Sequence, residues 1–172
     1  MSTIRYIILA LLLILAQGAL DNYVNMSVYI DLALCLYILL VLPPRWGAVP
    51  SMLVGFVLGL TVDVLGNGIP GMSAAAMTAA GLCRKSLFNL TAPKEKEKRQ
   101  SVETAGLRSF ILYALPIELI YLTVYILLDS SGFRPLGQCL AREGISLTAN
   151  TAMMAFLYII STDMSGRRRQ RT

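Results

Sequence analysis

The chain has 172 residues, 56% of them hydrophobic, with 15 lysine and arginine side chains against 10 aspartates and glutamates. Soluble domains are roughly 45–50% apolar, so the composition argues against an ordinary soluble domain. The net charge of +5 then reflects membrane topology, and no nucleic-acid binding is expected. This length predicts one domain, a single membrane domain over residues 1–172.

Six apolar stretches predict an all-α membrane protein with six spanning helices and both termini in the cytoplasm. A spanning helix needs ~20 apolar residues, and runs such as YIILALLLILA lack the alternation of a barrel strand. The predicted spans are residues 4–20, 28–42, 46–65, 70–90, 109–128 and 141–160. The first span also fits a cleaved signal peptide, but a retained helix is expected because multispanning proteins usually keep their first span.

The basic residues set the predicted orientation. With the N-terminus inside, 13 of the 15 basic residues, Arg84 among them, fall in cytoplasmic segments, and only Arg134 and Arg142 fall outside. The charged loop at about 91–108 and the basic tail at about 162–172 are then cytoplasmic. The loop is expected to be a solvated helical face or a topology anchor, and docking of a cytosolic partner or anionic lipid is its alternative. The tail is expected to fix the orientation and to contact lipid.

A stripe of small residues runs along the third predicted span. Gly47, Ser51, Gly55, Gly59 and Asp63 are spaced four apart, so they follow one slowly winding helix face. Small residues at this spacing let a second helix backbone approach closely. The fourth span, with GMSAAAMTAAG, is equally rich in small residues. We therefore predict a tight hairpin of spans three and four, with generic membrane packing as the alternative.

Two acidic residues lie toward the predicted outer side of the membrane. Asp63 ends the stripe just before the turn that contains Gly71. Its expected role is to accept hydrogen bonds from the backbone of that turn, and the alternative is a proton or cation ligand. Asp31 lies early in the second predicted span, near the outer interface.

A third acid, Glu118, lies near the middle of the fifth predicted span. Tyr121 and Tyr125 follow it at i+3 and i+7, so all three share a helix face. This face is expected to point into the bundle, where tyrosine hydroxyls, Asn150 or Thr151 could satisfy the carboxyl group. A structural polar anchor is the favoured interpretation, and a proton-relay or transport role is the alternative.

Catalytic and metal-binding signatures are weak. The sequence has no histidine, which removes His-based metal sites and Ser–His or Cys–His pairs. Cys35, Cys83 and Cys139 are isolated and odd in number, so they cannot form a complete disulfide framework. No phosphate-binding G-x-x-x-x-G-K-[ST] motif is present. We therefore expect no enzyme activity, no cofactor and no metal.

Residues 29–76 resemble the shared core of the rod shape-determining MreD family. The resemblance rests on an acid that opens an apolar helix, a tyrosine, prolines before a glycine-bearing helix, a G-x-x-x-G-L-x-x-D run and a glycine-bearing turn. These positions are Asp31, Tyr37, Pro43, Pro44, Gly55, Gly59, Leu60, Asp63 and Gly71, with Asn150 in the last span. Outside spans two to four the match is one of size and layout.

The resemblance implies a non-enzymatic protein of the bacterial inner membrane that maintains cell shape. It would bind MreC and, through the complex, meet MreB, RodA and a class B penicillin-binding protein, and so help position or regulate lateral peptidoglycan synthesis. The family fold resembles the six-helix substrate-binding subunits of energy-coupling-factor vitamin transporters, so such a transporter subunit is the alternative function. The Ala-x-x-x-Ala docking patch of those subunits is missing from the first span. The sequence is compatible with a monomer and with a homodimer.

Overall fold

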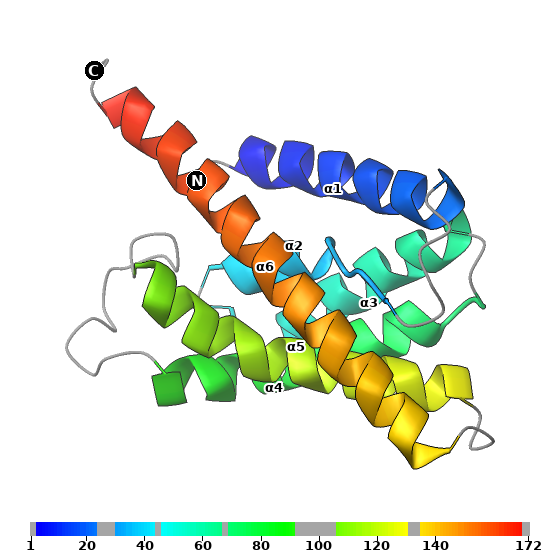
Figure 1. Ribbon diagram of the computed structural model, residues 1–172. Helices are drawn as coiled ribbons and strands as arrows, with labels where there is room; N and C mark the ends of the chain where they lie inside the picture. Colours follow the sequence, from blue (N-terminus) through cyan, green and yellow to red (C-terminus); the bar gives the residue numbers. More distant parts are fainter. Residues whose placement is uncertain are drawn as a thin grey trace.

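The computed structural model describes residues 3–23, 30–43, 46–66, 69–91, 106–130 and 135–169. Its regular elements are all helices: α1 (Thr3–Tyr23), α2 (Leu36–Val41), α3 (Ala48–Leu65), α4 (Met72–Thr91), α5 (Leu107–Ser130) and α6 (Leu136–Arg169) (Figure 1). Over these residues the protein is all-α, as predicted. Three helical stretches are long and apolar enough to cross a membrane, Ala48–Leu65, Leu107–Ser130 and Leu136–Thr162, and a shorter apolar helix covers Ile7–Asn22.

The second predicted span is wrong as a continuous helix. Instead of a helix over residues 28–42, α2 has only six residues. Residues 30–33 have no regular secondary structure and residues 34–35 form a turn. Residues 28 and 29 lie outside the described part of the chain. The reason is tertiary, because side chains of α1 and α6 bind the backbone that this helix would have used.

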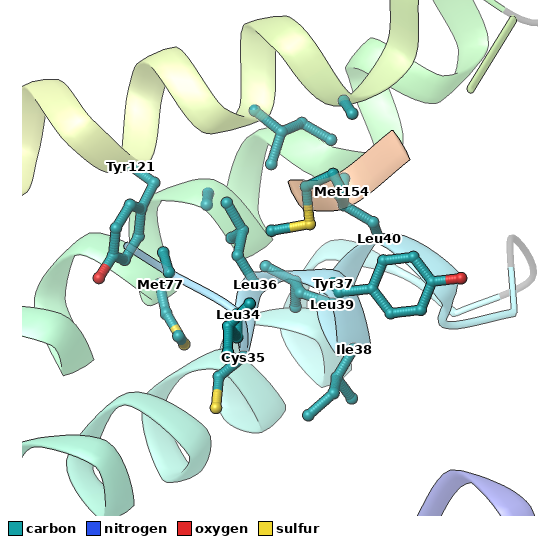
Figure 2. Packing of buried hydrophobic residues seen from close by; sticks show 14 of the residues in the cluster. Leu34, Cys35, Leu36, Tyr37, Ile38, Leu39, Leu40, Met77, Tyr121 and Met154 are labelled. Atoms are coloured by element: carbon teal, nitrogen blue, oxygen red, sulfur yellow. The ribbon is translucent and has the colours of Figure 1, made fainter. Parts of the chain in front are cut away.

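The core of the bundle is built around α2. All six of its side chains are buried, as expected of a helix that is apolar on every side. Figure 2 shows Leu36, Leu39 and Leu40 surrounded by side chains of other helices, including Met77 and Met154. The short helix therefore fills the centre of the bundle.

The longer helices pack around this centre. Helix α3 packs along α4, α4 along α5, and α5 along α6, while α1 lies against α2 and α3 (Figure 1). The outer surfaces of these helices are apolar: Val49, Leu53 and Val57 of α3 are each at least 60% exposed. Large exposed apolar surfaces on several helices suit contact with lipid, which is compatible with a helical membrane protein.

The two predicted cytoplasmic segments lie partly outside the described residues. The loop predicted at about 91–108 falls between Thr91 and Gly106 for most of its length. Helix α6 continues without interruption to Arg169, so the first part of the tail predicted at about 162–172 is helical.

Candidate functional site

The hairpin of α3 and α4 is held by close backbone contact. A Cβ atom on Gly59 would lie 2.5 Å from the Cα atom of Ala74, and one on Gly55 would lie 2.5 Å from the carbonyl oxygen of Met77. In the opposite direction, a Cβ atom on Gly81 would lie 2.7 Å from the carbonyl oxygen of Ser51. The helices can approach this closely only because these positions carry no larger side chain, as the small-residue stripe predicted.

Gly47 is the exception in this stripe. It precedes the first residue of α3 as its N-cap, with an extended backbone. The atom nearest to a Cβ built there is Cδ of Pro50, at 3.8 Å. The packed part of the stripe therefore begins at Ser51, and including Gly47 in it was wrong, because the helix has not yet started at that position.

Asp63 binds the backbone at the start of α4. Its carboxylate accepts hydrogen bonds from the N–H groups of Gly71 at 2.8 Å, Ser73 at 3.0 Å and Ala74 at 3.2 Å. These are among the groups that have no partner within the first turn of a helix. Gly71 has a φ of 102°, a conformation that favours glycine. The geometry agrees with an architectural role for Asp63, which ties the end of α3 to the turn and to α4.

Gln17 of α1 binds the non-helical segment that precedes α2. Its side-chain nitrogen donates to the carbonyl oxygen of Leu32 at 2.6 Å, and its side-chain oxygen accepts from the N–H group of Leu34 at 2.7 Å. Gln17 is only 4% exposed. One amide side chain thus satisfies two backbone groups that would otherwise be buried without partners.

Two side chains of α6 bind the same segment from another side. Ser146 accepts from the N–H group of Asp31 at 2.9 Å. Asn150 accepts from the N–H group of Ala33 at 2.8 Å and donates to the carbonyl oxygen of Asp31 at 2.6 Å. We call Gln17, Ser146 and Asn150 the polar clamp. Irregular backbone at membrane depth is tolerated where protein groups satisfy it, and the clamp supplies those groups.

An ion-pair network holds the side chain of Asp31, whose backbone is bound by the clamp. The Arg142 guanidinium of α6 binds both carboxylate oxygens of Asp31, at 2.6 and 2.7 Å, and also pairs with Asp129 at the end of α5. Asp31, predicted to lie early in a spanning helix, belongs instead to the non-helical segment before α2. Arg142, counted on the outer side of the membrane, is only 8% exposed and lies in the bundle. A bidentate arginine–carboxylate pair is geometrically specific, so it positions the segment as well as neutralising it.

The sequence contained one signal for this network that the prediction did not use. Arg142, Ser146 and Asn150 are spaced four apart on α6, so they share one face. That face meets residues 31–33. The spacing alone could not have identified the partner, because Asp31 and Arg142 are 111 residues apart in the chain.

Glu118 lies in the interior of the bundle, fully buried. Thr151 donates to Oε2 at 2.7 Å, and Oε1 has no hydrogen-bond partner among the described residues. Asn150, another predicted partner, binds residues 31 and 33 in the clamp instead. Tyr121 is buried, and its ring stacks on that of Tyr125 at a centroid distance of 5.9 Å. Of the partners predicted for a structural role of Glu118, the structure shows Thr151.

Arg84 is a second buried arginine that the sequence reasoning placed in a cytoplasmic segment. It belongs to α4 and is 1% exposed. Its guanidinium donates to the carbonyl oxygen of Leu42, the C-cap of α2, and to Ser51 Oγ at 3.3 Å. A cation at the C-terminal end of a helix interacts favourably with its dipole. Arg84 therefore secures the end of α2 that lies opposite the clamp.

The polar side chains described above bind other groups of the same chain. Among the described residues, no group of three or more His, Cys, Asp or Glu residues is arranged to hold a metal ion. The carboxylates of Asp31 and Asp63 are occupied by an arginine and by backbone N–H groups. Comparison of the chain with protein-family models, with curated proteins and with solved structures gives no match.

Proposed function

We propose that the protein is a non-enzymatic interaction component of the bacterial inner membrane that acts in the rod complex by binding MreC. The sequence resemblance of residues 29–76 to the MreD family suggests this role. The structural observation that supports it best is the filled centre of the bundle, where all six residues of α2 are buried. Such a protein would act through its surfaces and would help position or regulate lateral peptidoglycan synthesis.

The filled centre favours interaction over transport. Small-molecule sites are concave pockets with a few convergent polar groups. Here the convergent polar groups are Gln17, Ser146 and Asn150, and they bind the chain's own backbone. A substrate at this position would have to displace residues 31–34. This arrangement gives no support to the alternative of a vitamin-transporter subunit.

The remaining partners follow from the same proposal. MreC is the direct partner, and MreB, RodA and a class B penicillin-binding protein are reached through the complex. Anionic lipids would contact the basic residues near the C-terminal end, Arg167, Arg168, Arg169 and Arg171. The protein would span the inner membrane several times, and a homodimer is compatible with this function.

Co-purification from membranes tests the proposal. The tagged full-length protein is extracted in mild detergent and the proteins bound to it are identified by mass spectrometry. We expect MreC to be recovered. A Gly59→Leu variant should lose it, because that side chain would collide with the α4 backbone. A Gly144→Leu variant should retain it, because nothing lies within 4 Å of a Cβ atom at that position.

Other outcomes of this experiment would contradict the proposal. Recovery of transporter ATPase subunits with a bound vitamin, and without MreC, would establish the transporter function instead. Failure of the unaltered protein to recover MreC would also contradict it. Unchanged recovery of MreC by the Gly59→Leu variant would leave the proposed partner in place and contradict only the need for the α3–α4 hairpin in assembly.

A further inference from the structure

Arg84 is a buried cation without a neutralising carboxylate. Its guanidinium is 1% exposed and binds two uncharged oxygens, the carbonyl oxygen of Leu42 and Ser51 Oγ. By contrast, the buried Arg142 pairs with two aspartates. Among the described residues, no carboxylate pairs with Arg84. Buried charges in proteins are normally paired, so the site of Arg84 is electrostatically incomplete.

Two polar atoms in the same place have no hydrogen-bond partner. They are Nε of Arg84 and the hydroxyl oxygen of Tyr113, and neither makes a hydrogen bond to the described part of the chain. Tyr113 belongs to α5 and is 2% exposed, and it lies close enough to Arg84 for an electrostatic interaction. The guanidinium N–H can only donate, and a tyrosine hydroxyl can donate as well. One acceptor in contact with both groups would satisfy both, and the positive guanidinium favours an acceptor that is negative.

The depth of this pair matches the headgroup level of a membrane. Ser51, which Arg84 contacts, lies in the first turn of α3, where an apolar span begins at Ala48. Leu42, the other contact, shortly precedes Trp46, an exposed residue of the kind found at membrane interfaces. Arginines near the ends of spanning helices usually extend outward to the headgroups. Arg84 instead turns its guanidinium into the bundle at about the depth where lipid phosphates lie.

We propose that Arg84 and Tyr113 form a binding site for a phosphate group, which Arg84 neutralises and the Tyr113 hydroxyl orients. Guanidinium N–H groups form short, charge-assisted hydrogen bonds with phosphate oxygens. The phosphate is supplied by an anionic lipid headgroup or by the free ion. This site goes beyond the proposed role in the rod complex and does not depend on it.

Entry of the phosphate requires that a covering side chain move, because both groups are buried. Phe88 is half-buried, and its ring meets that of Tyr113 edge to face at a centroid distance of 5.5 Å. It follows Arg84 by one turn on the same face of α4, so it lies between the pair and the end of that helix. Rotation of the Phe88 ring would open the pair toward the headgroups.

Ligand-dependent thermal unfolding of the full-length protein tests the site. The protein is purified in a neutral detergent and freed of lipid, as verified by native mass spectrometry. Three probes are added at an ionic strength kept constant with chloride: dioctanoyl phosphatidylglycerol, dioctanoylglycerol, which has the same chains without phosphate, and inorganic phosphate. We expect the phospholipid to raise Tm and dioctanoylglycerol to leave it unchanged. An equal rise with inorganic phosphate would identify the free ion as a sufficient ligand, and a rise with the phospholipid alone would identify a lipid site.

Two substitutions remove the proposed ligand contacts. Arg84→Gln should abolish the ligand-dependent rise in Tm. Tyr113→Phe should weaken phosphate binding roughly ten-fold, the effect of losing one hydrogen bond to a charged ligand. Two control variants should bind as the unaltered protein does. Tyr125→Phe removes a hydroxyl group nearer the other end of α5, and Arg108→Gln removes an exposed cation from its first turn.

Two results would overturn the proposal. One is the absence of any rise in Tm with either phosphate-containing probe, which would leave a carboxylate of a partner protein as the source of the counter-charge. The other is a rise that both Arg84→Gln and Tyr113→Phe retain at unchanged affinity, which would place the ligand elsewhere. If Arg84→Gln does not fold, Tyr113→Phe decides the test alone. That variant should fold, because its hydroxyl group has no partner to lose within the described chain, and unchanged affinity in it counts against the site.

Discussion

The α3–α4 hairpin and the segment before α2 are both buried, but they are stabilised in different ways. In the hairpin, small residues bring two helix backbones into contact, and the residues concerned are close in sequence. In the segment, single side chains from distant helices bind backbone groups one by one. The hairpin is thus a packing interface that a sequence pattern can reveal. The segment is a polar contact region whose conformation depends on Gln17 of α1 and on α6 residues more than 100 positions away.

The largest effect is expected in the segment, at its ion pair. Arg142→Ala would leave the partly exposed carboxylates of Asp31 and Asp129 without their shared cation. Removing one partner of a fully buried pair costs about 3–5 kcal/mol, so we expect a loss of about 3 kcal/mol, at the lower end of that range. Unfolding in detergent micelles, followed by circular dichroism, measures the loss. Arg108→Ala is the control, because Arg108 is exposed in the first turn of α5. Equal stability of the two variants would show that the network does not hold the segment.

A smaller but clear effect is expected in the hairpin. Gly59→Ala would place a methyl group 2.5 Å from the Cα atom of Ala74 and from the carbonyl oxygen of Ser73, and overpacking of this kind costs about 1–3 kcal/mol. The same substitution at Gly144 meets nothing within 4 Å and should be neutral or slightly stabilising, since alanine favours helix. The comparison is made by thermal unfolding. A neutral Gly59→Ala would mean that the helices are not in tight contact.

Asp63 tests whether the hairpin also depends on polar contacts. Asp63→Ala removes the acceptor for three backbone N–H groups, and loss of a helix cap costs about 0.5–2 kcal/mol. Hydrogen exchange should accelerate at Gly71, Ser73 and Ala74 while the middle of α3 stays protected. Uniform acceleration along both helices would instead indicate that Asp63 supports the whole hairpin.

The smallest effect is expected at Glu118. Glu118→Gln keeps an oxygen that can accept from the Thr151 hydroxyl, so we expect a change in stability below about 1 kcal/mol. Under the proposed function, we also expect cells that carry only this variant to keep their rod shape. Glu118→Leu, which removes the acceptor, is the comparison variant and should be less stable. Loss of rod shape with Glu118→Gln, in a variant that folds and is produced normally, would favour an obligatory proton role.

Part of the candidate site could be predicted because its signals are local. The four-residue spacing from Ser51 to Asp63 marks one face of a helix, and the turn chemistry around Gly71 marks where the helix ends. The positions of Arg84 and Arg142 were misjudged because arginines near the ends of apolar stretches usually lie in loops. In the structure Arg84 binds Leu42 and Arg142 binds Asp31, both inside the bundle. No sequence pattern around either arginine indicates these partners.

The amino-acid order was enough to predict an all-α protein rich in helices suited to a membrane, because hydrophobic content and the length of apolar runs can be read directly from it. The same reading predicted the α3–α4 contact, because small residues at helical spacing permit close approach of two helix backbones. That residues 30–33 are not helical became visible only in the folded protein. Their local preference is helical, and hydrogen bonds from Gln17, Ser146 and Asn150 outweigh that preference once α1 and α6 are in place.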